Sequence, residues 1–189
     1  MKTTRARMEN LYSLNLKSRA KKMCNLELKL SYERIDDASV LSNFFCGIVE
    51  MDNFIHKSLQ NRIDRNDGLK LFAVISRGDI VAMTALKEST IEVHVPNNGK
   101  FSVDTLEIEY LAVVRQLQRN HIGKQIITWI EDTAVLEYPK AKYVSVRAFI
   151  DRDIDYSAVP FYEYCGFRVI QKLHPMANNV KMAKKISNQ

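Results

Sequence analysis

The sequence predicts an α/β (α+β) fold, in which helices cover both faces of a mixed, mostly antiparallel sheet that contains one parallel strand pair. Strand-like and helical segments alternate over residues 101–167, and a strand–helix–strand crossover makes its two strands parallel. Before and after that region, strand-like segments follow one another across short turns, and such hairpins are antiparallel. With 189 residues the chain is long enough to bury one ordinary core.

The first expected elements are a strand and two helical pieces. Leucines alternate with polar residues over residues 26–31, and this period of two indicates a strand. Asp36 or Asp37 is suited to cap the helical region that follows, because an aspartate accepts hydrogen bonds from the free N–H groups of a first helical turn. That region reaches Val49, and a second helical piece is expected over residues 51–62.

Hairpin strands are expected next. Two apolar runs flank Arg77-Gly78-Asp79, which has the composition of a tight turn between antiparallel strands. Pro96-Asn97-Asn98-Gly99 is a second turn signal. The strand that follows it shows its clearest alternation from Glu107 to Val113. The strands expected here are residues 69–76, 80–87, 90–95 and 101–114.

The strongest helical signal begins at Ile122. From there to Ala134 apolar residues recur with the spacing of one helix face, and Pro139 marks the end of the helix. Asp151–Asp155 is an acidic loop, and Gly166 is suited to the left-handed conformation that closes a short helix. The remaining expected elements are strands at residues 143–150, 167–173 and 180–186 and a helix at residues 158–164.

The formal net charge of +6 is concentrated at the two ends of the chain. Residues 1–24 carry seven basic side chains against Glu9 alone, and we expect a basic, poorly ordered arm there, ahead of a single domain over residues 25–189. After Glu163 the chain has five basic residues and no acidic one. We interpret both ends as solvated faces, and the alternative is an electrostatic footprint for an anionic partner such as RNA.

The composition disfavours several classes of protein. No apolar run reaches the ~18 residues of a membrane span, and the N-terminus lacks the apolar segment of a secretory signal, so we expect a cytoplasmic protein without a membrane partner. The three cysteines show neither metal-binding nor disulfide-framework spacing, and the histidines form no metal-ligand pattern, so no metal site is expected. The histidines are His56, His94, His121 and His174.

The junction between residues 113 and 125 is expected to hold an anion. A strand ends, a short polar turn follows and a helix begins, so main-chain N–H groups at the start of the helix point into open space. These groups and the helix dipole would stabilise a phosphate. Arg119 and Lys124 would either add positive charge at the rim of this anion site or lie exposed in solvent. The sequence favours neither interpretation over the other.

The same junction resembles a known family motif. Gln118 and Gly123 fit the first and last positions of Q/R-x-x-G-x-G/A, the acetyl-CoA-binding motif of the GNAT N-acetyltransferase superfamily. His121 stands where the family most often has glycine, and histidine is among the few other residues that tolerate positive φ. A second segment, residues 155–167, looks like the family's N-x-x-A-x-x-F-Y-E-x-x-G-F, with Asp155 in place of asparagine.

This resemblance implies a GNAT-like sheet with a splayed parallel strand pair, and acetyl-CoA as the cofactor. The strand backbone at residues 111–113 would hydrogen-bond the pantetheine arm, and main-chain N–H groups over residues 119–125 would hold the pyrophosphate. The candidate cofactor-binding residues are Leu111, Ala112, Val113, Gln118, Arg119, Asn120, His121, Ile122, Gly123, Lys124, Gln125, Asp155, Ala158 and Phe161.

Tyr162 is the candidate proton donor, because in the family a tyrosine at this position protonates the departing thiolate of coenzyme A. A phenol, with an ordinary pKa of about 10, suits a donor to a thiolate at neutral pH. The alternative for Tyr162 is a packed tyrosine whose hydroxyl finds an ordinary partner. Tyr156 is a weaker candidate for the same role.

Glu107 and Glu109 are the candidate bases. Strict alternation puts both carboxylates on one face of the strand, together with Leu111 and Val113. Two neighbouring carboxylates disfavour each other's ionisation, which makes one of them a better proton acceptor. Glu107 also lies six residues before Val113, where some family members that modify lysine side chains carry a catalytic glutamate. The alternatives are a solvated strand face and deprotonation through water without a dedicated base.

The function implied by the resemblance is direct transfer of an acetyl group to a primary amine on a small molecule, a peptide or a protein. Two alternatives stay open: a toxin-like enzyme that acetylates aminoacyl-tRNA, and a non-catalytic module that binds acyl-CoA as a sensor. The acidic middle of the chain favours a cationic amine or peptide, whereas the basic ends favour RNA. Assembly into a homodimer is left open as well.

Overall fold

The computed structural model describes residues 29–95, 99–171 and 177–187. The expected arm, residues 1–24, and residues 96–98 of the second turn lie outside these ranges. The strands are β1 (Ser31–Ile35), β2 (Lys70–Ser76), β3 (Asp79–Val95), β4 (Gly99–Val113), β5 (Tyr143–Asp151), β6 (Tyr156–Ser157), β7 (Arg168–Val169) and β8 (Asn179–Lys185). The helices are the 3₁₀ turns η1 (Ala38–Leu41) and η2 (Arg115–Leu117) and the α-helices α2 (Val49–Lys57), α3 (Leu59–Asp64), α4 (Ile122–Glu137) and α5 (Val159–Tyr164).

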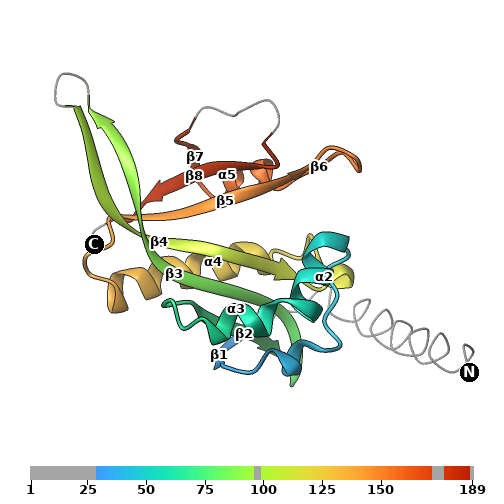
Figure 1. Cartoon of the computed structure of the whole chain (residues 1–189). Helices are drawn as coiled ribbons and strands as arrows, with labels where there is room; N and C mark the ends of the chain where they lie inside the picture. The colour runs from blue at the N-terminus through green and yellow to red at the C-terminus, as the bar shows by residue number, and fades with distance from the viewer. Residues whose placement is uncertain (1–28, 96–98, 172–176, 188–189) are drawn as a thin grey trace, which may run out of the picture.

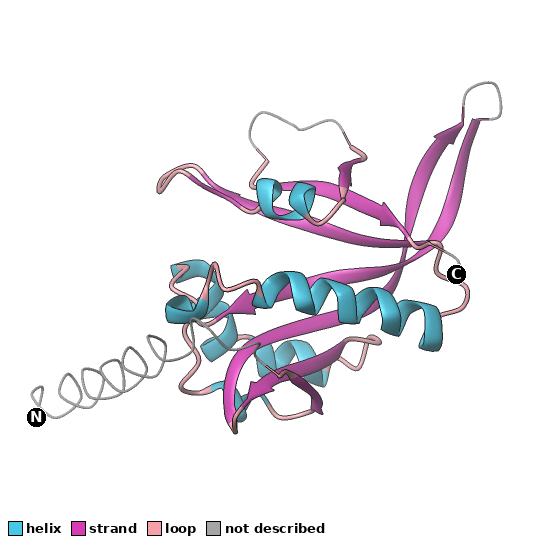
Figure 2. Ribbon diagram, turned by 180° about the vertical axis from the view of Figure 1, so that it is seen from behind, coloured by secondary structure: helices cyan, strands magenta, loops and turns pink. Residues whose placement is uncertain are grey.

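The described strands form one mixed sheet in the order β1-β2-β3-β4-β5-β8-β7, with β6 paired to the end of β5 (Figure 1). Among these pairs only β4 and β5 run parallel, because the crossover through α4 joins them. Helices α4 and α5 lie on one face of the sheet, and α2 and α3 lie on the other (Figure 2). The predicted mixed, mostly antiparallel sheet with helices on both faces is therefore confirmed.

Two apolar cores hold the helices on the sheet. The larger core lies between the sheet and helices α4 and α5, and it buries the predicted stripe of Ile122, Ile126 and Ile130. The smaller core lies between the sheet and the segment from η1 to α3, where Leu41 and Leu59 are buried. Burying a leucine or isoleucine side chain contributes about 1.5–3 kcal/mol, so these cores fix which face each helix covers.

The parallel strand pair is short, and it opens toward the carboxyl ends of both strands. Residues 105–108 of β4 pair with residues 143–146 of β5, although β4 continues to Val113 and β5 to Asp151. Beyond the paired rungs the two strands diverge (Figures 1 and 2). The sheet is therefore split into a larger half, β1 to β4, and a smaller half, β5 to β8.

A β-bulge marks the place where the two strands part. The ladder between β3 and β4 skips Glu109, which is the extra residue of the bulge. Ile108 before the bulge and Leu111 after it both pack in the larger core, although an unbroken alternation would put them on opposite faces. Glu107 therefore lies on the face opposite to Leu111 and Val113. The prediction that Glu107 shares a face with Leu111 and Val113 is wrong, because it assumes a period of two without interruption. Glu109 contacts Arg62 of α3 and so lies on the α2–α3 side of the sheet with Glu107.

The segment before α2 also differs from the prediction. Asp37 caps a helix as expected, but that helix is only the single turn η1. The chain then turns at Gly47, whose φ is +84°. The Asp52 carboxylate accepts hydrogen bonds from the N–H groups of Cys46 (2.8 Å) and Gly47 (3.0 Å). These bonds tie the turn to the start of α2 at Val49, where the sequence predicted the end of a first helix.

Most other predicted elements are confirmed with shifted ends. Arg77 and Gly78 have φ of +55° and +83°, the two positive values of a type I′ hairpin turn. The strand expected at residues 90–95 is the continuation of β3. Residues 26–28 of the expected first strand lie outside the described ranges, and β1 runs from Ser31 to Ile35. Gly166, with φ of +89°, closes α5 as predicted. No helix in the described part of the chain combines the length and the apolar character that a membrane crossing requires.

Candidate active site

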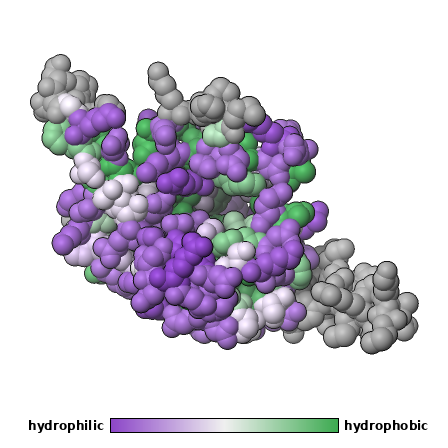
Figure 3. All heavy atoms as spheres, viewed as in Figure 1, coloured by the Kyte–Doolittle hydropathy of each residue, from purple (hydrophilic) through white to green (hydrophobic). Residues whose placement is uncertain are grey.

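The open end of the β4–β5 pair leaves one edge of β4 free. Among the described residues, those from Leu111 to Val113 pair only with β3. The other edge presents main-chain N–H and C=O groups, which an extended ligand can satisfy as an added strand would. The space-filling view shows the surface hollowed between β4 and β5 (Figure 3). The arrangement therefore suits an extended molecule that carries amide groups.

Helix α4 begins beside the end of β4 after a turn with two left-handed residues. Arg119 and His121 have φ of +64° and +59°, and His121 is the residue that precedes the helix. Gln125 N donates to His121 O (3.1 Å), so the N–H groups of residues 122–124 have no acceptor within the helix. Together with the positive end of the helix dipole, these N–H groups suit an anion such as a phosphate.

Two polar side chains of the motif stabilise the turn itself. Gln118 Nε2 donates to Cys46 O (2.7 Å) and to Val113 O (3.1 Å), which joins the turn to β4 and to the segment before α2. Asn120 Nδ2 donates to Leu117 O (3.2 Å). The side chains of both candidates are therefore engaged with main-chain carbonyls, and the Gln118 main chain is engaged as well, because its N–H donates to Arg115 O (3.4 Å) and its carbonyl accepts from Asn120 Nδ2 (3.4 Å).

The two family-like segments meet where α4 and α5 come together. A Cβ atom added to Gly123 would lie 3.0 Å from the Phe161 ring, tighter than most real contacts, so any other residue here would push that ring of α5 away by a few tenths of an ångström. Lys124 Nζ lies 5.1 Å from the centre of the Tyr164 ring. Arg119 is exposed. The structure thus brings the start of α4 against the helix that carries Tyr162.

Tyr162 is buried at this meeting point. Its ring packs edge-on against Phe161 and Phe167, with centroid distances of 5.0 Å and 5.4 Å. Burial raises the pKa of Tyr162 well above its ordinary value, and the nearby Tyr156 and Cys165 raise it further. Within the described residues its hydroxyl has no hydrogen-bond partner. The phenol therefore keeps its proton at neutral pH and has that proton available for a ligand.

Asp155 and Ala158 hold the first two specific positions of the second motif, and the structure gives them different roles. Asp155 is exposed in the turn between β5 and β6, with φ of +51°. Ala158 precedes α5, and its N–H donates to Phe149 O (2.9 Å), which fixes the start of the helix on β5. Ala158 thus positions Tyr162, whereas Asp155 shapes a surface turn.

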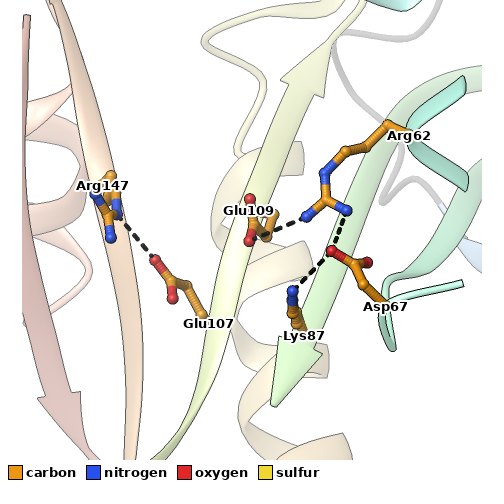
Figure 4. Close-up of polar contacts among 6 residues, drawn as sticks. All are labelled: Arg62, Asp67, Lys87, Glu107, Glu109 and Arg147. Atoms are coloured by element: carbon orange, nitrogen blue, oxygen red, sulfur yellow. Dashed lines mark hydrogen bonds and ion pairs between the residues drawn. The ribbon is translucent and has the colours of Figure 1, made fainter. Parts of the chain in front are cut away.

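The two candidate bases each face a guanidinium group (Figure 4). Glu107 is buried, and its Oε1 lies 3.3 Å from Nε of Arg147, which reaches across from β5. Glu109 Oε1 lies 3.6 Å from Arg62 on α3. The carboxylates therefore interact with separate cations rather than with each other. Each candidate base thus has a cationic partner that the sequence-based prediction did not include.

Sequence reasoning missed the rest of this charged network. Arg62 also donates to Asp67, and Lys87 Nζ lies 2.9 Å from the same carboxylate (Figure 4). The two cations hold the pKa of Asp67 at about 2, below its ordinary value. These residues come from α3, the loop after it and β3, so no local sequence pattern marks them as neighbours of Glu109.

The cysteine thiols and possible metal ligands were also located in the structure. In residues 29–95, 99–171 and 177–187, no three His, Cys, Asp or Glu side chains gather as a metal site would require. Cys46 is buried, and burial raises the pKa of its thiol to about 12. Such a thiol stays protonated and is a poor nucleophile.

A family comparison agrees with this geometry. Residues 35–184 match the family model described as "Acetyltransferase (GNAT) domain". The match covers most of the chain, and the protein therefore belongs to the GNAT acetyltransferase family. A search of curated proteins finds no match.

Several solved structures share the fold. One is described as "Crystal structure of bacterial toxin", with a TM-score of 0.65 and 16% identity over 85% of this chain and 92% of that one. A tyrosine-to-phenylalanine mutant of the toxin AtaT, bound to the C-terminus of the antitoxin AtaR and acetyl-CoA, has a TM-score of 0.60 and 19% identity over 83% and 93%. AtaT complexed with acetyl-methionyl-tRNAfMet has a TM-score of 0.59 and 18% identity over 81% and 94%.

Proposed function

We propose that this protein is an acetyl-CoA-dependent N-acetyltransferase that transfers the acetyl group directly to a primary amine. The observation that carries the proposal is the meeting of three features at the open end of the β4–β5 pair. They are the free edge of β4, the unpaired N–H groups at the start of α4, and the buried phenol of Tyr162. The match to the GNAT domain supports this combination.

Acetyl-CoA fits this site by its chemistry. Its pyrophosphate is an anion for the N–H groups of residues 122–124, and the amides of its pantetheine arm suit the free edge of residues 111–113. Arg119 is exposed beside the same turn and adds positive charge there. When bound, acetyl-CoA supplies a thioester carbonyl as the electrophile and a thiolate as the leaving group.

The residues of the chain handle two protons in this reaction. As the amine nitrogen bonds to the carbonyl carbon and the carbon–sulfur bond breaks, the nitrogen must lose one proton and the sulfur must gain one. Glu107 or Glu109 accepts the first proton, directly or through water, from the α2–α3 face of the sheet. Tyr162 Oη donates the second proton, because its raised pKa keeps the phenol protonated at neutral pH.

The replacement of Tyr162 by phenylalanine tests this proposal. A positioned general acid contributes about 10²–10⁴-fold, so we expect Tyr162→Phe to lower kcat by that order while the Kd for acetyl-CoA stays nearly unchanged. Tyr164→Phe is the matched control, because that ring is 64% exposed on the same helix. Thiol release against a panel of amines measures kcat, and calorimetry measures Kd. An unaltered kcat in Tyr162→Phe would remove this residue from the role.

A second candidate acceptor is the amino group of an aminoacyl-tRNA. The toxin AtaT, whose fold this chain shares at 18% identity, has been solved with acetyl-methionyl-tRNAfMet. The basic residues at both ends of the sequence also favour an anionic acceptor. Binding of tRNA that weakens steeply with salt would support this candidate, and a flat salt response would exclude it. Binding of acetyl-CoA without turnover on any acceptor would instead support a sensor.

A further inference from the structure

The smaller half of the sheet has one face without a helix. Val144, Val146 and Ala148 of β5 point into the larger core on the side of α4 and α5. The alternate residues of β5 and β8 therefore point the other way, and among the described residues no helix lies over them (Figures 1 and 2). We call this surface the open face. Its central rungs pair Arg147 with Lys181, Ser145 with Ala183 and Tyr143 with Lys185.

Four cationic side chains surround the middle of the open face. Arg147, Lys181 and Lys185 belong to its outer rungs, and Arg168 joins them from the neighbouring strand β7. The Arg147 side chain is 63% exposed, and Arg168 and Lys185 are exposed as well. The middle rung carries Ser145 and Ala183, which are both buried, so the cationic side chains around this rung are the part of the face that a ligand can reach.

Acidic residues neutralise only one of these cations. Arg147 pairs with Glu107 at the edge of the open face that adjoins β4. Lys181, Lys185 and Arg168 make no ion pair with a described residue. The open face therefore carries a net positive charge, and its complement is a partner with several spaced negative charges.

Aromatic rings stand at the end of the open face that is nearest to the proposed active site. Phe149 is the next residue after Arg147 on the same side of β5, and its ring lies 6.3 Å from that of Tyr156 on β6. Tyr156 in turn lies close enough to Tyr162 to raise its pKa. A ring pair beside a row of cations suits the bases and phosphates of a single strand of nucleic acid.

We propose that the open face binds the single-stranded end of an RNA whose terminal amine is the acceptor. The phosphates lie along Arg168, Lys181 and Lys185, and the terminal bases stack near Phe149 and Tyr156, next to the hollow between β4 and β5. This inference rests on the second candidate of the proposed function. A duplex would not satisfy it, because paired bases cannot stack on protein rings.

The experiment measures fluorescence anisotropy of a labelled, short single-stranded RNA at a series of salt concentrations. The double variant Arg168→Glu/Lys185→Glu removes two of the cations without touching the residues placed in catalysis. The matched control, Arg34→Glu/Lys57→Glu, makes the same charge change at exposed positions on β1 and α2. Each lost phosphate contact lowers the salt slope by about 0.7 for a single strand, so we expect the open-face variant to lose about 1.4 of slope.

At low salt we expect the open-face variant to bind the RNA at least about tenfold more weakly than the control variant. Equal affinity and equal slope in the two variants would overturn the proposal, as would a wild-type preference for duplex RNA. Acetyl-CoA binding and thiol release with a small amine are measured on the same samples. If the wild-type protein neither binds acetyl-CoA nor releases thiol, the proposed function is refuted. If it does both but does not bind the RNA, only the open-face proposal is refuted.

Discussion

The left-handed conformation of His121 gives a prediction whose magnitude can be worked out from the structure. Its φ is +59°, in the left-handed region. This conformation costs a residue with a Cβ atom about 1–2 kcal/mol of stability, a cost that glycine does not have. The His121 side chain makes no capping hydrogen bond, so its removal loses no such contact. Glycine relieves this strain, but it also raises the conformational entropy of the unfolded chain, which lowers the stability of the fold by about 0.4–1 kcal/mol. The difference between the two terms spans about 0–1.6 kcal/mol, so we expect His121→Gly to raise the free energy of unfolding by about 0.8 kcal/mol.

The opposite substitution sharpens this test. Valine is branched at Cβ and is a genuine outlier at positive φ, so His121→Val should lower the free energy of unfolding by about 1–2 kcal/mol. Urea denaturation of both variants beside the wild type measures these differences. Calorimetry should find the Kd for acetyl-CoA nearly unchanged in His121→Gly, because the proposed phosphate contacts are main-chain N–H groups. A destabilised glycine variant together with an unaffected valine variant would refute the reasoning.

Two further substitutions probe the turn and the charged network. Gln118→Leu removes two hydrogen bonds and leaves carbonyl groups of Cys46 and Val113 unsatisfied, so urea denaturation should show a loss of about 1–3 kcal/mol; no loss would mean that water replaces the amide. Asp67 has a pKa lowered to about 2 in the folded protein, so its stabilising effect is complete above its ordinary pKa of 3.8 and disappears as the pH falls toward 2. The stability difference between wild type and Asp67→Asn should therefore shrink over that range, and a constant difference would contradict the assignment.

The sequence predicts the parts of the fold that depend on local periodicity. The stripe from Ile122 to Ala134 needs only the 3.6-residue repeat, and α4 buries the expected side chains. The hairpin at Arg77-Gly78-Asp79 and the closing glycine Gly166 depend on turn chemistry that single residues reveal. The family-like spacing around Gly123 and Tyr162 likewise predicts that two distant helices meet, and Gly123 does contact Phe161.

The sequence does not predict what depends on one extra residue or on distant partners. The bulge at Glu109 reverses the alternation of β4, and no composition signal separates it from a regular strand. The guanidinium groups of Arg62 and Arg147 reach the two candidate bases from α3 and β5, which only the tertiary fold brings near. The role of Gln118 also changes, because its amide is occupied by main-chain carbonyls.

The most direct test of the central claim is an acetyl-CoA titration followed by backbone amide chemical shifts in NMR. If acetyl-CoA binds along β4 and at the start of α4, the amide chemical shifts of residues 111–113 and 122–124 should change strongly and saturate. Those of the distant turn Arg77-Gly78-Asp79 should not change. The absence of shifts at residues 122–124 under saturating acetyl-CoA would contradict the claim that this helix terminus holds the pyrophosphate.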